Sequence, residues 1–82
     1  LSAEQGNAYA HRSIGFMYQF GNGVLKDNVT AHMWYNIASA NGIEEAGEWR
    51  DGLEDSMTPE AIEKATTIAQ ECMANDYKKC GY

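Results

Sequence analysis

The sequence predicts an all-α protein of about four antiparallel helices, arranged as an α/α helical repeat. Apolar residues recur at helical spacing in four successive segments of the 82 residues. Glycines or helix-capping residues separate these segments, and the single proline, Pro59, stands where a helix is expected to begin. The second half of the chain also repeats the apolar pattern of the first half. No segment requires a strand.

The first helix is predicted within residues 1–20. Its apolar positions at helical spacing, which we expect to form the inner face, are Ala10, Ile14, Met17 and Tyr18. A second stripe, expected on the opposite side of this helix, combines aromatic and polar side chains. It consists of Tyr9, Arg12, Phe16 and Gln19.

Two glycines one residue apart in YQFGNGVLKD, residues 18–27, indicate either a phosphate-binding loop or a hinge between helices. A nucleotide-binding fingerprint requires a preceding strand and a third glycine, but Lys26 occupies that position and the preceding segment is helical. We therefore interpret the segment as a helix-hairpin hinge. Gly21 suits a left-handed residue that closes the first helix, and Gly23 a second such residue that turns Val24 inward.

The second helix is predicted to begin after Asp27, whose side chain should cap it by accepting a hydrogen bond from the Thr30 amide. Gly42 is placed to end the helix in the left-handed conformation. One face carries the apolar residues Ala31, Trp34, Tyr35 and Ala38. We expect Trp34 and Tyr35 to lie in the core.

Two further helices are predicted in the second half. The third helix is marked by Ala46, Trp49, Leu53 and Met57. Thr58, Pro59 and Glu60 are typical of an N-cap, a first-turn proline and a first-turn acid at the start of the fourth helix. The apolar face of this helix carries Ile62, Ala65, Ile68, Ala69, Cys72 and Met73.

An internal repeat divides the chain into residues 1–42 and residues 43–82. Aligning Gly6 with Gly42 aligns Ala10 with Ala46 and Met17 with Leu53. The second copy is degenerate, because the Met-Thr-Pro-Glu segment replaces its glycine hinge. A final repeat that lacks repeat-type residues is typical of a capping helix pair.

Residues 3–42 resemble a Sel1-like repeat. The positions that match the family's pattern are Ala10, Ile14, Gly15, Met17, Tyr18, Gly21, Gly23, Val24, Asp27, Ala31, Trp34, Tyr35, Ala38 and Gly42. Residues 43–82 match only loosely, although the Met-Thr-Pro-Glu segment is similar to the C-terminal ends of bacterial members. This similarity predicts that the chain is the C-terminal portion of a bacterial member. Because its first residue is Leu1 and not Met, we also expect it to be processed or excised.

The resemblance implies an α/α solenoid related to tetratricopeptide repeats that acts as a protein-interaction scaffold, not as an enzyme. In such solenoids the first helix of each pair lines the concave groove. The stripe of Tyr9, Arg12, Phe16 and Gln19 would then bind a partner protein or peptide. The alternative is that Tyr9 and Phe16 pack against a neighbouring repeat. A self-associating structural module and a hydrolase with a groove site using His11, Arg12 or the acidic residues are the rival functions.

The formal net charge of −6 lies entirely in residues 41–82. It argues against nucleic acid and anionic membranes as partners and permits a basic protein partner. Four acidic residues share one face of the third helix: Glu44, Glu48, Asp51 and Asp55. They form either a solvated face or a docking strip for a basic partner. No apolar run approaches the roughly 18 residues of a membrane span.

No cofactor, metal site or catalytic residue is predicted. His11 and His32 lack partners at ligand spacing and are expected on the surface or in the groove. Ser13 and Ser39 lack a nucleophile motif. The sequon that begins at Asn28 falls in the first turn of a helix, which disfavours glycosylation.

The two cysteines, Cys72 and Cys80, are predicted to form a disulfide. Two free structural thiols are the alternative, and a metal site is disfavoured because C-x-x-C spacing is absent. A disulfide implies an oxidising compartment, so we expect a periplasmic or secreted protein. A cytoplasmic location stays open.

Overall fold

A computed structural model of the chain describes residues 6–75, and the regular structure within that range is all helical. The helices are α1 (Gly6–Phe20), α2 (Asn28–Ala40), α3 (Glu44–Leu53) and α4 (Pro59–Ala74), with a short 3₁₀ turn, η1 (Glu54–Ser56), directly after α3. No strand occurs among the described residues. The prediction of four helices without strands is confirmed.

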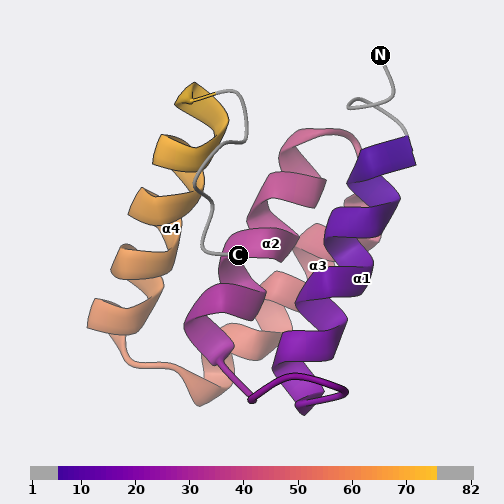
Figure 1. Ribbon diagram of the computed structural model, residues 1–82. Helices are drawn as coiled ribbons and strands as arrows, with labels where there is room; N and C mark the ends of the chain where they lie inside the picture. Colours follow the sequence, from indigo (N-terminus) through magenta and orange to yellow (C-terminus); the bar gives the residue numbers. More distant parts are fainter. Residues whose placement is uncertain (1–5, 76–82) are drawn as a thin grey trace.

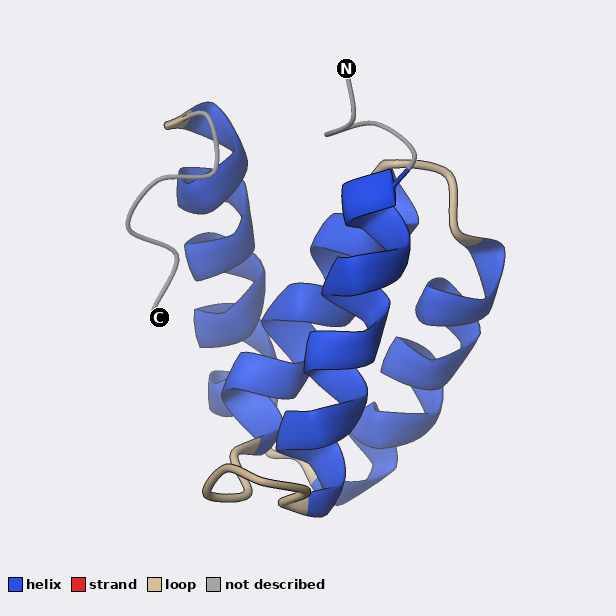
Figure 2. Ribbon diagram, turned by 45° about the vertical axis from the view of Figure 1, so that its right-hand side comes forward, coloured by secondary structure: helices blue, strands red, loops and turns tan. Residues whose placement is uncertain are grey.

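The second helix, α2, is the centre of the molecule. Consecutive helices run antiparallel, with α4 on one side of α2 and α1 and α3 on the other (Figure 1). Each of the other three helices makes its main packing contacts with α2. Figure 2 shows α3 and α4 on either side of the α1–α2 pair. The side chains that α2 buries are Ala31, His32, Met33, Trp34, Tyr35, Ile37 and Ala38.

Two hydrophobic clusters share α2. The cluster toward α1 and α3 contains Ala8, Ala31, Tyr35, Ala38, Ile43, Ala46 and Leu53. The cluster toward α4 contains Met33, Trp34, Ile37, Ala69 and Cys72. Tyr18 of α1 packs against both clusters and links them. Because Trp34 and Tyr35 are fully buried, their predicted core positions are confirmed.

The predicted hinge between α1 and α2 is also confirmed. Gly21 and Gly23 have φ angles of +66° and +86°, in the region that strains residues with a Cβ atom. The Asp27 side chain then caps α2 by accepting hydrogen bonds from the amides of Val29 and Thr30 at 3.1 and 3.2 Å. The chain therefore leaves α1 and enters α2 through locally encoded geometry.

The connection from α2 to α3 is equally well defined. Gly42 has a φ of +101°, as its predicted role at the end of α2 requires. The amide of Gly42 donates to the Ser39 carbonyl and that of Ile43 to the Ala38 carbonyl, both at 3.1 Å. This pair of bonds is a Schellman motif, which satisfies the last carbonyls of α2 and turns the chain into α3.

The start of α4 follows the predicted capping pattern. The Thr58 hydroxyl accepts a hydrogen bond from the Ala61 amide at 3.1 Å, and Pro59 is the first residue of the helix. The predicted end of the third helix is wrong, because α3 stops at Leu53 and η1 follows. Met57 has extended backbone but still packs against the cluster shared with α3.

The predicted inner face of α1 needs correction. Ala10 is exposed and Met17 is 36% exposed, whereas His11 and Gly15 are buried. A Cβ atom at Gly15 would lie 2.7 Å from two ring carbons of Tyr35, so the glycine lets α1 approach α2 closely. The hydrophobic pattern misses these two positions because glycine has no side chain and histidine is polar.

Both histidines are buried, so their predicted surface or groove positions are wrong. The His11 ring lies 5.0 Å from the Trp34 ring, centroid to centroid, and burial lowers the pKa of His11. His32 Nε2 is hydrogen-bonded to Glu54 Oε2 at 2.8 Å, which ties α2 to η1. These imidazoles therefore belong to the packed interior.

Cys72 is buried on α4 in the cluster with Trp34. Cys80 lies outside the described residues, so its pairing with Cys72 stays a prediction. Within residues 6–75, no helix has both the length and the apolar character needed to cross a bilayer.

Candidate interaction surface

The candidate partner-binding stripe lies beside the packed face of α1, not opposite it. Tyr9, Arg12 and Phe16 each come one position after a buried residue (Ala8, His11 and Gly15), and Gln19 comes one position after the partly buried Tyr18. One position along a helix is a rotation of about 100°. This rotation directs the stripe toward α3. Tyr9 and Phe16 are 54% and 43% exposed, while Arg12 and Gln19 are half-buried.

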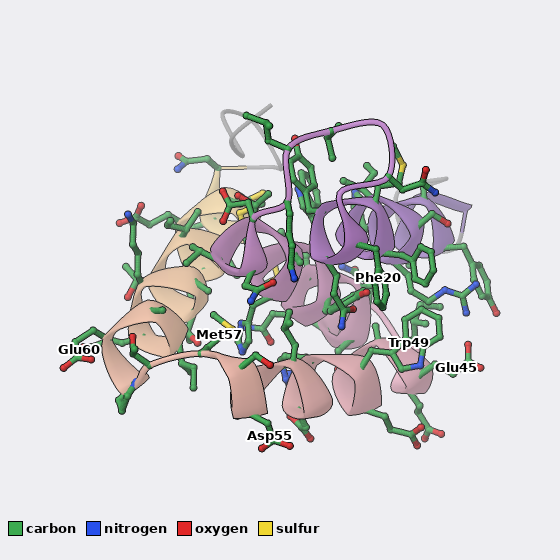
Figure 3. All side chains as sticks on the ribbon, turned by 90° about the horizontal axis from the view of Figure 1, so that it is seen from below. Phe20, Glu45, Trp49, Asp55, Met57 and Glu60 are labelled. Carbon is green, nitrogen blue, oxygen red and sulfur yellow. The ribbon has the colours of Figure 1, made fainter. Side chains whose placement is uncertain are left out.

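Aromatic side chains from α1 and α3 meet on this surface. The Phe16 ring centroid lies 4.8 Å from that of Phe20 and 6.2 Å from that of Trp49. The Trp49 ring also meets the buried Tyr35 ring edge-on, at 5.8 Å and 75°. Figure 3 shows Phe20 and Trp49 on the same side of the molecule, one from each helix, with Glu45 beside Trp49. Phe20 is 61% and Trp49 37% exposed, so this aromatic group is open to solvent.

The aromatic group surrounds a hollow of about 370 Å³ between the two helices. Its lining residues are Phe16, Gln19, Phe20, Glu48, Trp49, Gly52 and Leu53. A second hollow of about 220 Å³ shares Phe16 and Trp49 with the first. It is completed by Arg12, Ser13 and Met17. We call the two adjoining hollows the α1–α3 groove.

Gly52 forms a bare patch on the α3 wall of this groove. A Cβ atom built there would meet nothing within 4 Å. The two glycines buried between helices differ, since a Cβ atom would lie 2.7 Å from Tyr35 at Gly15 and 3.0 Å from the Ser39 hydroxyl at Gly47. Packing within the chain therefore explains Gly15 and Gly47 but does not explain Gly52.

The charges on the two walls are unequally compensated. The Arg12 guanidinium forms an ion pair with Glu45, and its central carbon lies 5.4 Å from the Tyr9 ring and 5.2 Å from the Trp49 ring. Among the described residues, Glu48 has no ion-pair partner. The positive charge of Arg12 is thus neutralised by an ion pair, while the negative charge of Glu48 is not.

Gln19 is held by the core. The Tyr35 hydroxyl donates a hydrogen bond to Gln19 Oε1 at 2.6 Å. Burial raises the pKa of Tyr35 to about 12, partly offset by the nearby Arg12 charge, so the phenol keeps the proton that it donates. Gln19 therefore connects the groove to the interior, a role that the helical pattern did not predict.

The four acidic residues predicted on one face of the third helix do not all belong to the groove. Asp55 lies in η1, because α3 ends at Leu53. Glu44, Glu48, Asp51 and Asp55 are exposed, but only Glu48 lines the larger hollow. Asp51 pairs with the adjacent Arg50 at 3.1 Å, and Asp55 projects away from Phe20 and Trp49 (Figure 3). This arrangement combines a solvated face with one acidic position at the groove.

The smaller hollow of the groove is lined by both polar and apolar side chains. Ser13 shares its hollow with neither a carboxylate nor a histidine among the described residues. No group of three or more potential metal ligands occurs in that part of the chain. The sequence interpretation missed Phe20 and Gly52 as groove residues and treated Trp49 only as part of an apolar face.

Comparison of the chain with protein-family models, with curated proteins and with solved structures finds no match.

Proposed function

We propose that the chain is a protein-interaction module of the Sel1-like, helical-repeat type that binds a segment of a partner protein along the α1–α3 groove. One observation carries the proposal: two helices hold half-exposed Phe16, Phe20 and Trp49 around a hollow that their own side chains leave open. Aromatic side chains provide large contact areas and dominate many protein interfaces. An exposed cluster of this kind is typical of a binding surface.

The roles of the repeat-type residues support this assignment of family. Gly15 accommodates Tyr35 where α1 crosses α2, and Gly21 provides the turn between the two helices. Asp27 caps α2, and Gly42 directs the chain into α3. These residues build a helix hairpin that a repeat could reproduce along a solenoid.

The stripe residues divide into two roles in this proposal. Phe16 contacts the partner inside the groove, and Tyr9, whose exposed ring lies beside Arg12 but outside the two hollows, contacts it at the edge. Gln19 supports the groove through Tyr35. Arg12 holds the Trp49 ring in place from its position between the two helices. Binding requires neither a cofactor nor a metal ion.

Selection from a random peptide library displayed on phage tests the proposal. Peptides selected on the wild-type chain should lose binding to an Arg12→Ala/Phe16→Ala double variant that keeps its helical circular dichroism. Lys64→Ala/Glu63→Ala on the exposed side of α4 is the matched control and should bind as the wild type does. Selected peptides that bind the groove variant and the wild type equally well would overturn the proposal.

We also propose an exported location in a bacterium, which rests on the predicted Cys72–Cys80 disulfide. Intact-mass measurement after alkylation without reduction should find no alkylated thiol in protein taken from its native compartment. Two alkylated thiols would exclude both the bridge and the location inferred from it.

A further inference from the structure

The bare patch at Gly52 leaves room for another chain to approach the backbone of α3 closely. Glycine within a helix destabilises it relative to alanine, and here no neighbouring atom requires the glycine. A glycine with open space around it in a lined hollow lets a ligand reach the helix surface. Because Phe16, Phe20, Trp49 and Leu53 make up most of the lining here, the hollow favours an apolar side chain at this point.

The uncompensated charge at the same place is negative. Glu48 precedes Gly52 by one helical turn and is the only charged residue among those that line the larger hollow. Glu44 lies one turn earlier on the same side of α3, and like charges at this spacing repel each other. A cation placed beside Glu48 would relieve this repulsion.

We infer that the α1–α3 groove selects a basic peptide segment in which an apolar side chain occupies the Gly52 patch and an adjacent lysine or arginine pairs with Glu48. This inference rests on the proposed function and specifies the chemistry of its partner. The apolar side chain supplies most of the contact area. The cation supplies preference over neutral and acidic segments of the same shape.

A second copy of the chain fits this surface less well than a basic peptide does. A symmetric dimer through the groove would bring two acidic α3 helices into one interface, where the Glu44 and Glu48 charges of both copies would repel one another. The formal charge of the chain, −6, adds to that repulsion. The charge pattern therefore favours a partner of opposite sign.

Paired substitutions in peptide and protein test the inference. Each groove-dependent peptide from the display selection is synthesised with a fluorescent label, alongside a version in which its lysines and arginines are glutamine. Polarisation measurements then compare both peptides on the wild-type chain and on Glu48→Gln. We expect removal of the cations to weaken binding to the wild type about fivefold and to change binding to Glu48→Gln little.

Two variants make the test specific. Asp55→Asn removes an exposed acid outside the groove and should keep the full preference for the cationic peptide. Gly52→Leu fills the patch and should weaken binding of both peptides at least about tenfold. Because the site of the new Cβ atom is open, this variant should remain folded.

The outcomes distinguish failure of the basic-segment inference from failure of the proposed function. Peptides that need the groove but show no coupling between their cations and Glu48 would overturn the basic-segment inference and leave the proposed function standing. An absence of groove-dependent peptides would overturn both. Sedimentation showing that the wild type dimerises and that Gly52→Leu does not would identify the occupant as a second copy, which also overturns the inference.

Discussion

The helices α2 and α3 differ sharply in how they use their side chains, although α3 is only slightly shorter. Almost every side of α2 is buried, with Trp34 and Tyr35 fully enclosed. In contrast, the buried residues of α3 are Ala46, Gly47 and Leu53, and its tryptophan is 37% exposed. The difference indicates that α2 contributes more to the core than α3 does, and it leaves the exposed side of α3 available for the recognition proposed above.

The two tryptophans give the strongest test of this contrast. Trp34→Ala should lower the free energy of unfolding by about 3–5 kcal/mol, because it opens a cavity between α2 and α4. Trp49→Ala should lower it by only about 1–2 kcal/mol, because the ring is already partly solvated. Chemical denaturation of both variants measures the difference. Equal losses would show that α3 contributes to the core as much as α2 does.

Valine substitutions at two helical glycines test the same difference between the packed helix contact and the exposed side of α3. Gly15→Val should cost about 3 kcal/mol, because its Cβ atom would overlap the Tyr35 ring in the α1–α2 contact. Gly52→Val meets open space and should stabilise the fold by a few tenths of a kcal/mol, about the helix-propensity difference. Denaturation midpoints check both values. A destabilised Gly52→Val variant would mean that the groove wall is tightly packed.

A valine in the hinge between α1 and α2 should destabilise the fold less than a valine in the α1–α2 contact does. Gly21→Val should cost about 2 kcal/mol, since a β-branched residue is strained at a φ of +66°. Gly52→Val is again the matched control, because Gly52 lies in α3 with ordinary helical backbone. Thermal unfolding of the two variants provides the measurement. An unchanged melting temperature for Gly21→Val would contradict the assigned backbone conformation.

The smallest expected effect concerns pH. Burial beside Trp34 lowers the pKa of His11 from its ordinary value of 6.5. Below about that pH the unfolded chain therefore takes up a proton that the folded chain resists, and the free energy of unfolding falls. His11→Gln should show a shallower fall than the wild type in denaturation series from about pH 8 to pH 5. Parallel curves would mean that His11 does not couple folding to pH.

Local signals made the hairpin predictable from the sequence, whereas close helix contacts were not predictable. Glycines at positive φ and an aspartate at an N-cap are determined by backbone chemistry within a few residues, as at Gly21 and Asp27. The contact of Gly15 with Tyr35 depends on how two helices cross, which no local pattern encodes. The burial of His11 follows from the same crossing.

The candidate site was predicted in part for a similar reason. The spacing of Arg12 and Phe16 correctly placed both residues on one stripe, but the sequence could not show which helix this stripe would face. Its position beside Trp49 and Gly52 depends on the packing of α1 and α3 on α2. A tryptophan within an acidic helix was the one available signal that α3 contributes to the surface.

The most direct test of the division between α2 and α3 is a titration of the ¹⁵N-labelled chain with a selected peptide, followed through its two tryptophan indole N–H signals. Trp49 lines the groove, whereas Trp34 is fully buried among α1, α2 and α4. The proposal predicts that the Trp49 signal shifts with peptide concentration while the Trp34 signal stays in place. A shift of Trp34 as large as that of Trp49, or peptide binding that moves neither signal, would contradict it.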